Sequence, residues 1–162
     1  MTQENIELLE GNFAPDFTID TDGSGIMTLS EFRKKKNVVL YFYPKDATPG
    51  CTLEAQDFRD KISSFEDKDT EIIGLSKDDI KSHDKFKEKQ CLPFTLASDA
   101  NSTVCEAYGC WVEKNMYGKK YMGIRRDTYL IDKEGKIRKI WKKVKVDGHV
   151  DEVLSTINNL GI

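Results

Sequence analysis

The residues best placed to do chemistry in this sequence are a cysteine and its neighbours. Cys51 lies in the stretch YFYPKDATPGCTLEAQDF, just after an apolar run typical of a buried strand. Thr48 suits the N-cap of a helix, and Pro49 suits its first position. A thiol in that first turn faces free backbone N–H groups and the positive end of the helix dipole, which stabilise the thiolate. The stretch therefore predicts a reactive cysteine, with a buried cysteine that only packs as the plain alternative.

Several other thiol chemistries lack their partner residues. A papain-like protease needs a histidine base, and neither His83 nor His149 has neighbours that suggest a triad. A tyrosine phosphatase needs an arginine six residues after the cysteine, where Asp57 stands. The chain has no CxxC pair for disulfide exchange or zinc binding. Attack on a small electrophile such as a peroxide remains, with a disulfide reductase or thiol transferase using Cys51 as the enzymatic alternative.

A second stretch, DTDGSGIMTLSEF, raises the question of calcium binding. Asp20, Asp22 and Glu31 stand at positions one, three and twelve of an EF-hand-like loop. An EF-hand needs a helix on each side, but Pro15 and alternating apolar residues precede the loop, and only EFRKKK separates it from the buried strand at Val38. We therefore expect a polar hairpin turn and no metal. A calcium-binding or redox-sensing module is the non-enzymatic alternative.

Hydrophobic patterning predicts the elements that position Cys51. We expect strands at 37–43, 71–75, 127–131 and 136–146, helices at 53–65, 78–90, 102–108 and 150–160, and an irregular stretch at 111–123. The strand–helix–strand rhythm indicates parallel strands, and the turn DKEG predicts a hairpin between the last two strands. The order βαβ then ββα predicts an α/β, thioredoxin-like fold, a central mixed sheet flanked by helices.

Composition and charge indicate the number of domains, the classes of partner and the cell compartment. With 162 residues, 38% hydrophobic and 33% charged, we expect one domain spanning 1–162. The net charge of −3 argues against nucleic acid, and the lysines of IRKIWKKVKV are expected on the solvated face of a strand. No apolar run could span a membrane, and the polar start MTQENIELLEG is unlike a signal peptide. Four cysteines without a CxxC pair suit a reducing cytoplasm, where we expect the protein.

The longer motif identifies a family resemblance. Pro44, Thr48 and Cys51 form P-x-x-x-T-x-x-C, and FYPKDATPGCTLEA resembles the peroxiredoxin Q branch of the peroxiredoxins, also called bacterioferritin comigratory protein. APDFTI and LSEF are similar to that family's N-terminal β-hairpin, and LPFTLASD to its central loop, with Thr95 where proline is expected. EKNMYGKKYMGIRRDTYLID resembles its second active-site segment, and KVKVDGHVDEVL the start of its C-terminal helix. The resemblance covers most of the chain.

The resemblance implies a thiol peroxidase that reduces hydrogen peroxide and organic hydroperoxides in antioxidant defence. Cys51 would be the peroxidatic cysteine, which becomes a sulfenic acid. Thr48 would hydrogen-bond the peroxide and the thiolate, Pro49 would shield the sulfur from water, and Pro44 completes the motif. Thioredoxin or a glutaredoxin-type dithiol would supply electrons to a monomer or weak dimer, and no cofactor, metal, haem or flavin is implied.

The resemblance also assigns the charged residues near the thiol. Arg126, two residues before Thr128, matches the family's arginine and would stabilise the thiolate and polarise the O–O bond. Arg125 is expected to be a surface ion-pair partner instead. Glu54, one turn into the helix, is expected to orient its neighbours rather than react.

The resolving cysteine is where this sequence departs from the family. The position five residues after Cys51 is Gln56, and the alternative position on the later helix is about Lys87, so neither is a cysteine. If the helix extends that far, Cys91 lies on the same face one turn later, and it is the first candidate. Cys110 is the next, because Cys105 sits in an apolar helical pattern that predicts core packing. A one-cysteine cycle resolved by an external thiol stays open.

Overall fold

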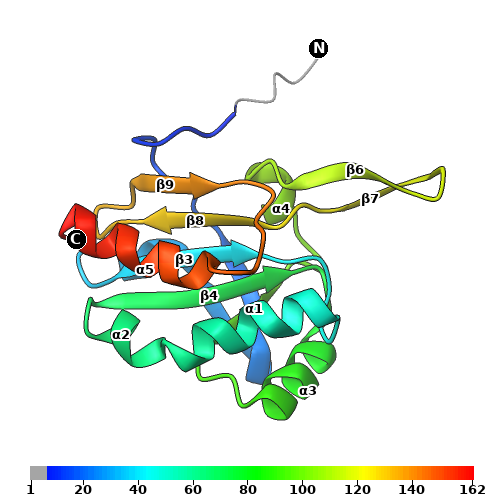
Figure 1. Cartoon of the computed structure of the whole chain (residues 1–162), viewed down its shortest axis with the longest axis horizontal. Coiled ribbons are helices and arrows are strands. Elements are labelled where there is room, and N and C mark those ends of the chain that lie inside the picture. The colour runs from blue at the N-terminus through cyan, green and yellow to red at the C-terminus, as the bar shows by residue number, and fades with distance from the viewer. Residues whose placement is uncertain (1–6) are drawn as a thin grey trace.

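The apolar run predicted as a strand before Cys51 forms an inner strand of a mixed β-sheet with helices on both faces (Figure 1). The computed structural model describes residues 7–162; the first six residues of the polar start, expected not to be a signal peptide, lie outside the described residues. The strands are β1 Thr18–Thr21, β2 Gly25–Thr28, β3 Asn37–Phe42, β4 Thr70–Ser76, β5 Thr95–Ser98, β6 Trp111–Met116, β7 Lys119–Ile124, β8 Asp127–Ile131 and β9 Ile137–Trp141. The helices are α1 Pro49–Asp60, α2 Ile62–Glu66, α3 Ile80–Gln90, α4 Val104–Ala107 and α5 His149–Leu160, with short 3-10 turns η1 Asp22–Ser24 and η2 Leu29–Phe32. Within the described part, no helix is long and apolar enough to cross a membrane.

The strand pairing confirms the predicted mixed sheet. Its seven strands have the order β2-β1-β5-β4-β3-β8-β9. β3, β4 and β5 run parallel, because helices α1 and α3 carry the chain back between them. β8 pairs antiparallel with β3 and with β9, which confirms the hairpin predicted at DKEG. The carboxyl end of β3, from which Cys51 follows, is therefore in the interior of the sheet.

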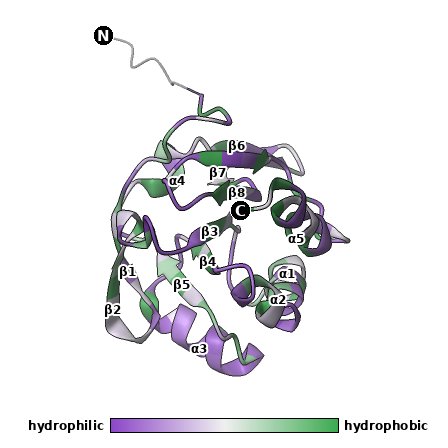
Figure 2. Ribbon diagram, turned by 90° about the vertical axis from the view of Figure 1, so that its left-hand side faces the viewer, coloured by the Kyte–Doolittle hydropathy of each residue, from purple (hydrophilic) through white to green (hydrophobic). Residues whose placement is uncertain are grey.

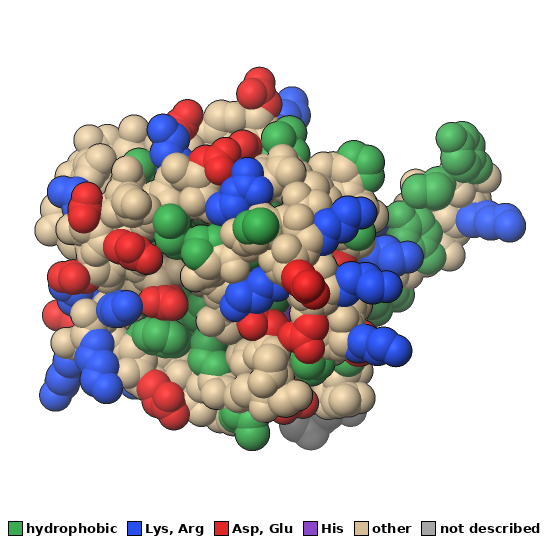
Figure 3. Space-filling view, turned by 90° about the horizontal axis from the view of Figure 1, so that it is seen from below, with side chains coloured by type: hydrophobic (Ala, Val, Ile, Leu, Met, Phe, Trp, Pro, Cys, Tyr) green, Lys and Arg blue, Asp and Glu red, His purple; other side chains and the backbone are tan. Residues whose placement is uncertain are grey.

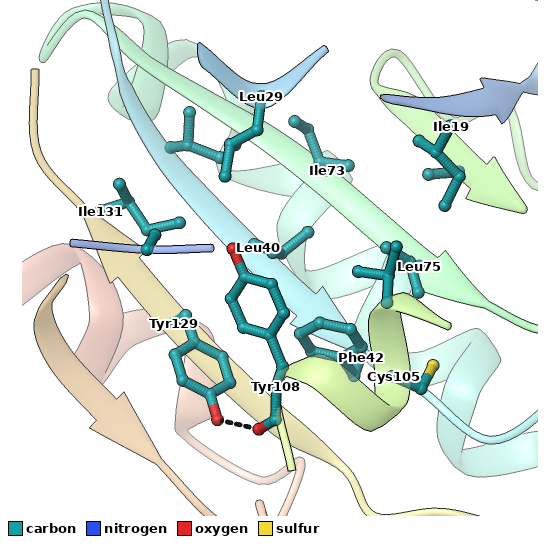
Figure 4. Packing of buried hydrophobic residues seen from close by; sticks show 14 of the residues in the cluster. Ile19, Leu29, Leu40, Phe42, Ile73, Leu75, Cys105, Tyr108, Tyr129 and Ile131 are labelled. Atoms are coloured by element: carbon teal, nitrogen blue, oxygen red, sulfur yellow. Dashed lines mark hydrogen bonds between the residues drawn. The ribbon is translucent and has the colours of Figure 1, made fainter. Parts of the chain in front are cut away.

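Alternation along β3 divides the core into two layers. Val38, Leu40 and Phe42 pack in the cluster on one face, whereas Val39 and Tyr41 pack in the cluster on the other. Figure 4 shows the first cluster, and Figure 2 shows α1, α2 and α5 grouped on the second face with α4 on the opposite side. Every residue of β3 is buried, so the strand is a rigid base for the loop that follows it.

Two tyrosine hydroxyls of the first layer donate hydrogen bonds to backbone carbonyls of neighbouring segments. The Tyr129 hydroxyl donates to the backbone carbonyl of Tyr108 at 2.6 Å (Figure 4). The Tyr108 hydroxyl donates to the carbonyl of Pro15, also at 2.6 Å, and thereby holds the segment that leads into β1. These buried hydroxyls all find partners, as buried polar groups should.

The aspartate-rich loop is the predicted hairpin turn between β1 and β2. Neither flank of the loop is an α-helix of the EF-hand kind. The Asp22 carboxylate accepts the Leu96 backbone N–H at 2.9 Å and contacts Lys87 Nζ at 2.8 Å. It therefore joins the hairpin to β5 and to α3. The family's N-terminal β-hairpin is thus present in this chain.

The expectation of an irregular stretch at 111–123 is wrong, because β6 and β7 form a separate two-stranded hairpin there. Its turn is Tyr117–Gly118, where both residues have positive φ, 53° and 80°, as a tight two-residue hairpin turn requires. Figure 3 shows it projecting at the right with hydrophobic and basic side chains. Met116, Tyr117, Tyr121 and Met122 are exposed on it, so no core-facing stripe marked these strands.

Other boundaries also differ from the predicted ones. The helix expected at 53–65 is two helices, α1 and α2, separated at Lys61, whose φ of −109° is not helical. The strand expected at 136–146 stops at Trp141, because Lys143 has a left-handed φ of 52° and the chain then turns so that the Val144 N–H donates to the Arg126 carbonyl at 2.7 Å. β5 lies in the stretch interpreted as a loop.

Candidate active site

Cys51 lies in the first turn of α1, as predicted. Thr48 occupies the N-cap position with extended backbone angles, and Pro49 is the first helical residue. The N-cap prediction for Thr48 is confirmed by position. Its hydroxyl donates to the Lys45 carbonyl at 2.8 Å, so the hydrogen bond expected from this hydroxyl to the Cys51 thiolate is absent from the described structure. Cys51 is only 1% exposed, so its side chain is largely shielded from water. Its place in the first turn puts it at the positive end of the helix dipole.

Arg126 reaches the sulfur from the segment between β7 and β8. Its Nη2 donates to Cys51 Sγ at 3.3 Å. The side chain is 16% exposed, so the contact is weakly screened by water. Gly50 leaves room for the guanidinium, because a Cβ at that position would lie 3.2 Å from Nη2. The structure thus brings together the cysteine and the arginine that the sequence singled out, although they stand 75 residues apart.

Glu54 shares the same arginine. Its Oε1 accepts from Arg126 Nη1 at 2.7 Å, and the carboxyl group is fully buried one turn after Cys51. Burial raises the pKa of Glu54 to about 7 even though Arg126 opposes the rise. Among the described residues, its second oxygen Oε2 has no hydrogen-bond partner. One guanidinium therefore faces two acids, and protonation of Glu54 leaves its positive charge to the sulfur.

Arg125 forms an ion pair as expected, but the pair is not on the surface. Its Nε and Nη2 contact the two carboxylate oxygens of Asp127 at 2.8 Å and 2.7 Å. Asp127 is fully buried and also accepts the Lys143 N–H at 3.1 Å. This bidentate pair joins the residues on either side of Arg126. It therefore holds the backbone from which the Arg126 side chain reaches Cys51.

Cys91 is exposed and lies at the end of α3 rather than within it. It is the C-cap, with a left-handed φ of 53°, because Pro93 two residues later cannot continue a helix. The helix therefore does not extend as far as Cys91, and the placement of Cys91 on the helical face, which required that, does not hold. Its neighbour Gln90 accepts from Gln56 Nε2 at 2.9 Å and from Arg59 Nη1 at 2.8 Å. Cys91 thus follows a residue that packs on α1 beside Gln56.

Cys105 and Cys110 lie in the core on the other face of the sheet. Both are fully buried in the cluster that includes Phe42, whereas Cys51 belongs to the opposite cluster. Core packing of Cys105 is confirmed. Cys110 Sγ lies 3.5 Å from the Cys105 carbonyl, so it packs inside the layer and the sheet separates it from Cys51. All four cysteines are free thiols in the described structure.

Sequence reasoning missed a buried polar network beneath the Cys51 loop. Asp46, in that loop, contacts His83 of α3 at 2.7 Å, and Asp78 lies beside them. Ligand atoms of these three side chains lie within 4.8 Å of one another, the one group in residues 7–162 that could hold a metal ion. Hydrogen bonds among these side chains and their protein neighbours explain why the three groups lie together. Asp46 lies within the motif, but nothing in the sequence pairs it with a histidine 37 residues away.

A cysteine at a helix N-terminus, paired with an arginine from a neighbouring strand segment, is the arrangement expected of a thiol-based peroxidase. Residues 11–140 match the AhpC/TSA family. The chain belongs to this family, in its peroxiredoxin Q, or Bcp, branch, and is an oxidoreductase of the peroxidase class.

Similar proteins agree along nearly the whole chain. Peroxiredoxin Bcp of Bacillus subtilis is 51% identical over 150 residues, covering 93% of this chain and 95% of that one. The crystal structure of a cysteine-to-serine variant of Xylella fastidiosa PrxQ has a TM-score of 0.90 at 36% identity, covering 96% and 99% of the two chains. The bacterioferritin comigratory protein of Xanthomonas campestris, described with alkyl peroxide reduction activity, has a TM-score of 0.85 at 40% identity, covering 90% and 92%. The predicted thioredoxin-like fold is confirmed.

Proposed function

We propose that this protein is a thiol-dependent peroxidase that reduces hydrogen peroxide and organic hydroperoxides through Cys51. The observation that supports this most directly is the 3.3 Å contact between Arg126 Nη2 and the Cys51 sulfur at the start of α1. A guanidinium and a helix N-terminus both favour the thiolate over the thiol, and the thiolate is the nucleophile. The alkyl peroxide reduction of the Xanthomonas campestris relative supports the same substrate class.

In the proposed first step, the Cys51 thiolate attacks one oxygen of the peroxide. The S–O bond forms as the O–O bond breaks, and the leaving oxygen takes a proton and departs as water or an alcohol. The sulfur is oxidised to a sulfenic acid and the peroxide is reduced by two electrons. Arg126 stabilises the negative charge that moves from sulfur to the leaving oxygen.

The motif residues around the sulfur have distinct proposed roles. Thr48 donates its hydroxyl proton to the Lys45 carbonyl, so the lone pairs of its oxygen remain free to accept the O–H of a peroxide. Pro49, at the first helical position, has no N–H to attract water and shields the sulfur. Pro44 ends the buried strand and directs the loop toward α1. Glu54 orients Arg126 and does not react.

For the second step, we propose that the Cys91 thiol attacks the sulfenic acid, which releases water and leaves a disulfide. Support comes from its exposure and from its neighbour Gln90, which packs on α1 near Cys51. A positive φ at a non-glycine residue and an end-of-helix position suit a segment that rearranges easily. Thioredoxin or a glutaredoxin-type dithiol then reduces the disulfide. Cys110 is the second candidate, and a one-cysteine cycle is the alternative.

We also propose the setting in which this chemistry takes place. Residues 1–162 would act as one domain, since a single seven-stranded sheet draws strands from residues 18 to 141. A monomer or weak dimer in the cytoplasm fits an enzyme whose exposed Cys91 must meet a dithiol protein. Its role would be antioxidant defence and redox homeostasis.

The test compares Cys51→Ser with Cys91→Ser in peroxide consumption. With dithiothreitol as reductant, we expect Cys51→Ser to lose all turnover, and Cys91→Ser to retain it because the small dithiol reduces the sulfenic acid directly. With thioredoxin as reductant, Cys91→Ser should also lose most turnover. Substantial turnover by Cys51→Ser would refute the mechanism. Disulfide exchange catalysed without peroxide turnover would favour a thiol transferase.

A further inference from the structure

A buried polar network fastens the loop between β3 and α1 to helix α3. The Tyr43 hydroxyl donates to Asp46 Oδ1 at 2.6 Å. Asp46 Oδ2 accepts the Ser82 hydroxyl at 2.8 Å and lies 2.7 Å from His83 Nδ1. The Asp46 backbone N–H donates to Asp78 Oδ2 at 2.8 Å. Both carboxylates therefore join the loop that precedes Cys51 to α3 or to the residues just before it.

The geometry makes the central contact an ion pair. His83 Nε2 lies 2.9 Å from the Ala97 carbonyl oxygen, which can only accept, so this nitrogen carries a proton. Nδ1 faces the carboxylate of Asp46, which already accepts from Tyr43 and Ser82 in the manner of an ionised group. Both ring nitrogens thus donate, and the imidazole is positively charged. The side chains are 0% and 3% exposed, so removing one partner leaves a buried charge uncompensated.

The surroundings of His83 favour that charge. The titratable groups facing it are Asp46 of the loop, Asp78 before α3 and the Tyr43 hydroxyl at the end of β3. Burial lowers the pKa of His83, but the hydrogen bond and the charge of Asp46 outweigh it, so the pKa is raised above its ordinary 6.5. The histidine side of the ion pair is therefore charged below this raised pKa, and the pair is lost as the pH rises through it.

The loop needs such an anchor because it is strained. Ala47, between Asp46 and the N-cap Thr48, has a left-handed φ of 62°. This conformation is unfavourable for a residue with a Cβ and persists only where its surroundings fix it. The residues that follow are those that set the position of Cys51. A loop released from Asp46 would relax at Ala47 and move the start of α1 relative to Arg126.

We propose that the Asp46–His83 ion pair is a positioning device that holds the Cys51 loop in the conformation that attacks peroxide. When the pair is weakened, attack by Cys51 slows and the loop is freed for disulfide formation with Cys91. The inference rests on the proposed function, because it assigns a role in the reaction of Cys51. Neither Asp46 nor His83 touches the reacting atoms, so they act through the loop.

The test measures two rates by stopped flow and mass spectrometry: oxidation of reduced Cys51 by hydrogen peroxide, and conversion of its sulfenic acid into a disulfide. Asp46→Asn keeps the shape of the side chain and removes the charge. The loss of a buried charged hydrogen bond predicts oxidation slowed about 10–100-fold. The sulfenic acid should then convert to disulfide faster than in the unmodified protein. In the unmodified protein, conversion to the disulfide should also accelerate as the pH rises through the pKa of His83. This pH dependence should be absent in Asp46→Asn.

Two further variants make the test specific. Lys87→Gln removes the ion pair of α3 with Asp22, at 2.8 Å, and loosens the same helix from the hairpin without touching the Cys51 loop. Both rates should stay within about twofold of the unmodified protein, because this partly buried ion pair lies outside the network that holds the Cys51 loop. Ser82→Ala removes one donor to Asp46 and should slow oxidation severalfold, which keeps the test decisive if Asp46→Asn does not fold.

Slower oxidation and faster disulfide formation in Asp46→Asn or Ser82→Ala, with Lys87→Gln unchanged, is the expected result. Unchanged rates in both loop-network variants would overturn the inference, and so would an equal slowing in Lys87→Gln. If Cys51 of the unmodified protein is not oxidised at all, the proposed function fails instead. The two failures are therefore distinguishable.

Discussion

Glu54→Gln gives a direct test of the electrostatics at the site. The carboxyl group is fully buried, and burial raises its pKa from 4.5 to about 7 against the opposition of Arg126. An acid with a raised pKa in the folded state is fully stabilising below its unfolded pKa and loses that contribution as the pH rises. A tenfold change in an ionisation constant is worth about 1.4 kcal/mol, so this rise corresponds to about 3 kcal/mol. We expect the unmodified protein to lose about that much relative to Glu54→Gln between pH 4.5 and pH 8.

The assay is urea unfolding of reduced protein at several pH values, with the free energy of unfolding obtained by linear extrapolation. Glutamine keeps an acceptor for Arg126 Nη1, which contacts Oε1 at 2.7 Å, so the variant removes the charge and retains the packing. Glu66→Gln, on the exposed surface of α2, is the matched control and should show no such difference. If the unmodified protein instead loses stability relative to Glu54→Gln as the pH falls below 4.5, Arg126 holds the carboxylate ionised and the reasoning is refuted.

Two further substitutions test the arginine. Arg126→Ala should slow oxidation of Cys51 by peroxide about 100-fold and move the reaction to higher pH, because the thiolate loses its cation; a pH–rate profile identical to that of the unmodified protein would count against the assigned role. Gly50→Ala places a Cβ 3.2 Å from Arg126 Nη2, so the guanidinium must shift by a few tenths of an ångström, and stopped-flow oxidation should be severalfold slower. Thr52→Ala, one position beyond Cys51, is its control, and equal slowing in both would show that the helix start is merely sensitive to any change.

The parts of the fold that the sequence predicted well are those with a strong hydrophobic pattern. The run NVVLYF is buried throughout as β3, and Val150, Val153 and Ile157 form the buried stripe of α5. These elements bury apolar surface in a regular period, which is the signal that sequence patterns report. The hairpin β6–β7 buries little apolar surface, so hydrophobic periodicity did not predict it. Its Tyr117–Gly118 turn was a usable clue.

The site was predictable wherever one short segment decides its geometry. Thr48, Pro49 and Cys51 are local to the start of α1, so cap and proline preferences sufficed. Arg126 came only from the family resemblance, because its contact with Cys51 depends on how β8 pairs with β3. The Asp46–His83 pair depends on the packing of α3 under the loop, which no local pattern encodes.

The positions of Cys91 and Cys110 also depend on tertiary packing that no local pattern encodes. Helical spacing from position 87 suggested that Cys91 continues the face of α3, but the helix ends one residue earlier because Pro93 follows. For Cys110 the sequence could not show on which side of the sheet the sulfur lies. Both residues stand in or beside turns, where side-chain direction is set by tertiary contacts.

The measurement that tests the central claim most directly is peptide mass spectrometry of fully reduced protein after one equivalent of hydrogen peroxide. The account predicts that Cys51 is the residue oxidised, seen either as one added oxygen on its peptide or as a disulfide that joins it to Cys91. If Cys51 is recovered as an unmodified thiol while the peroxide is consumed, the account is contradicted.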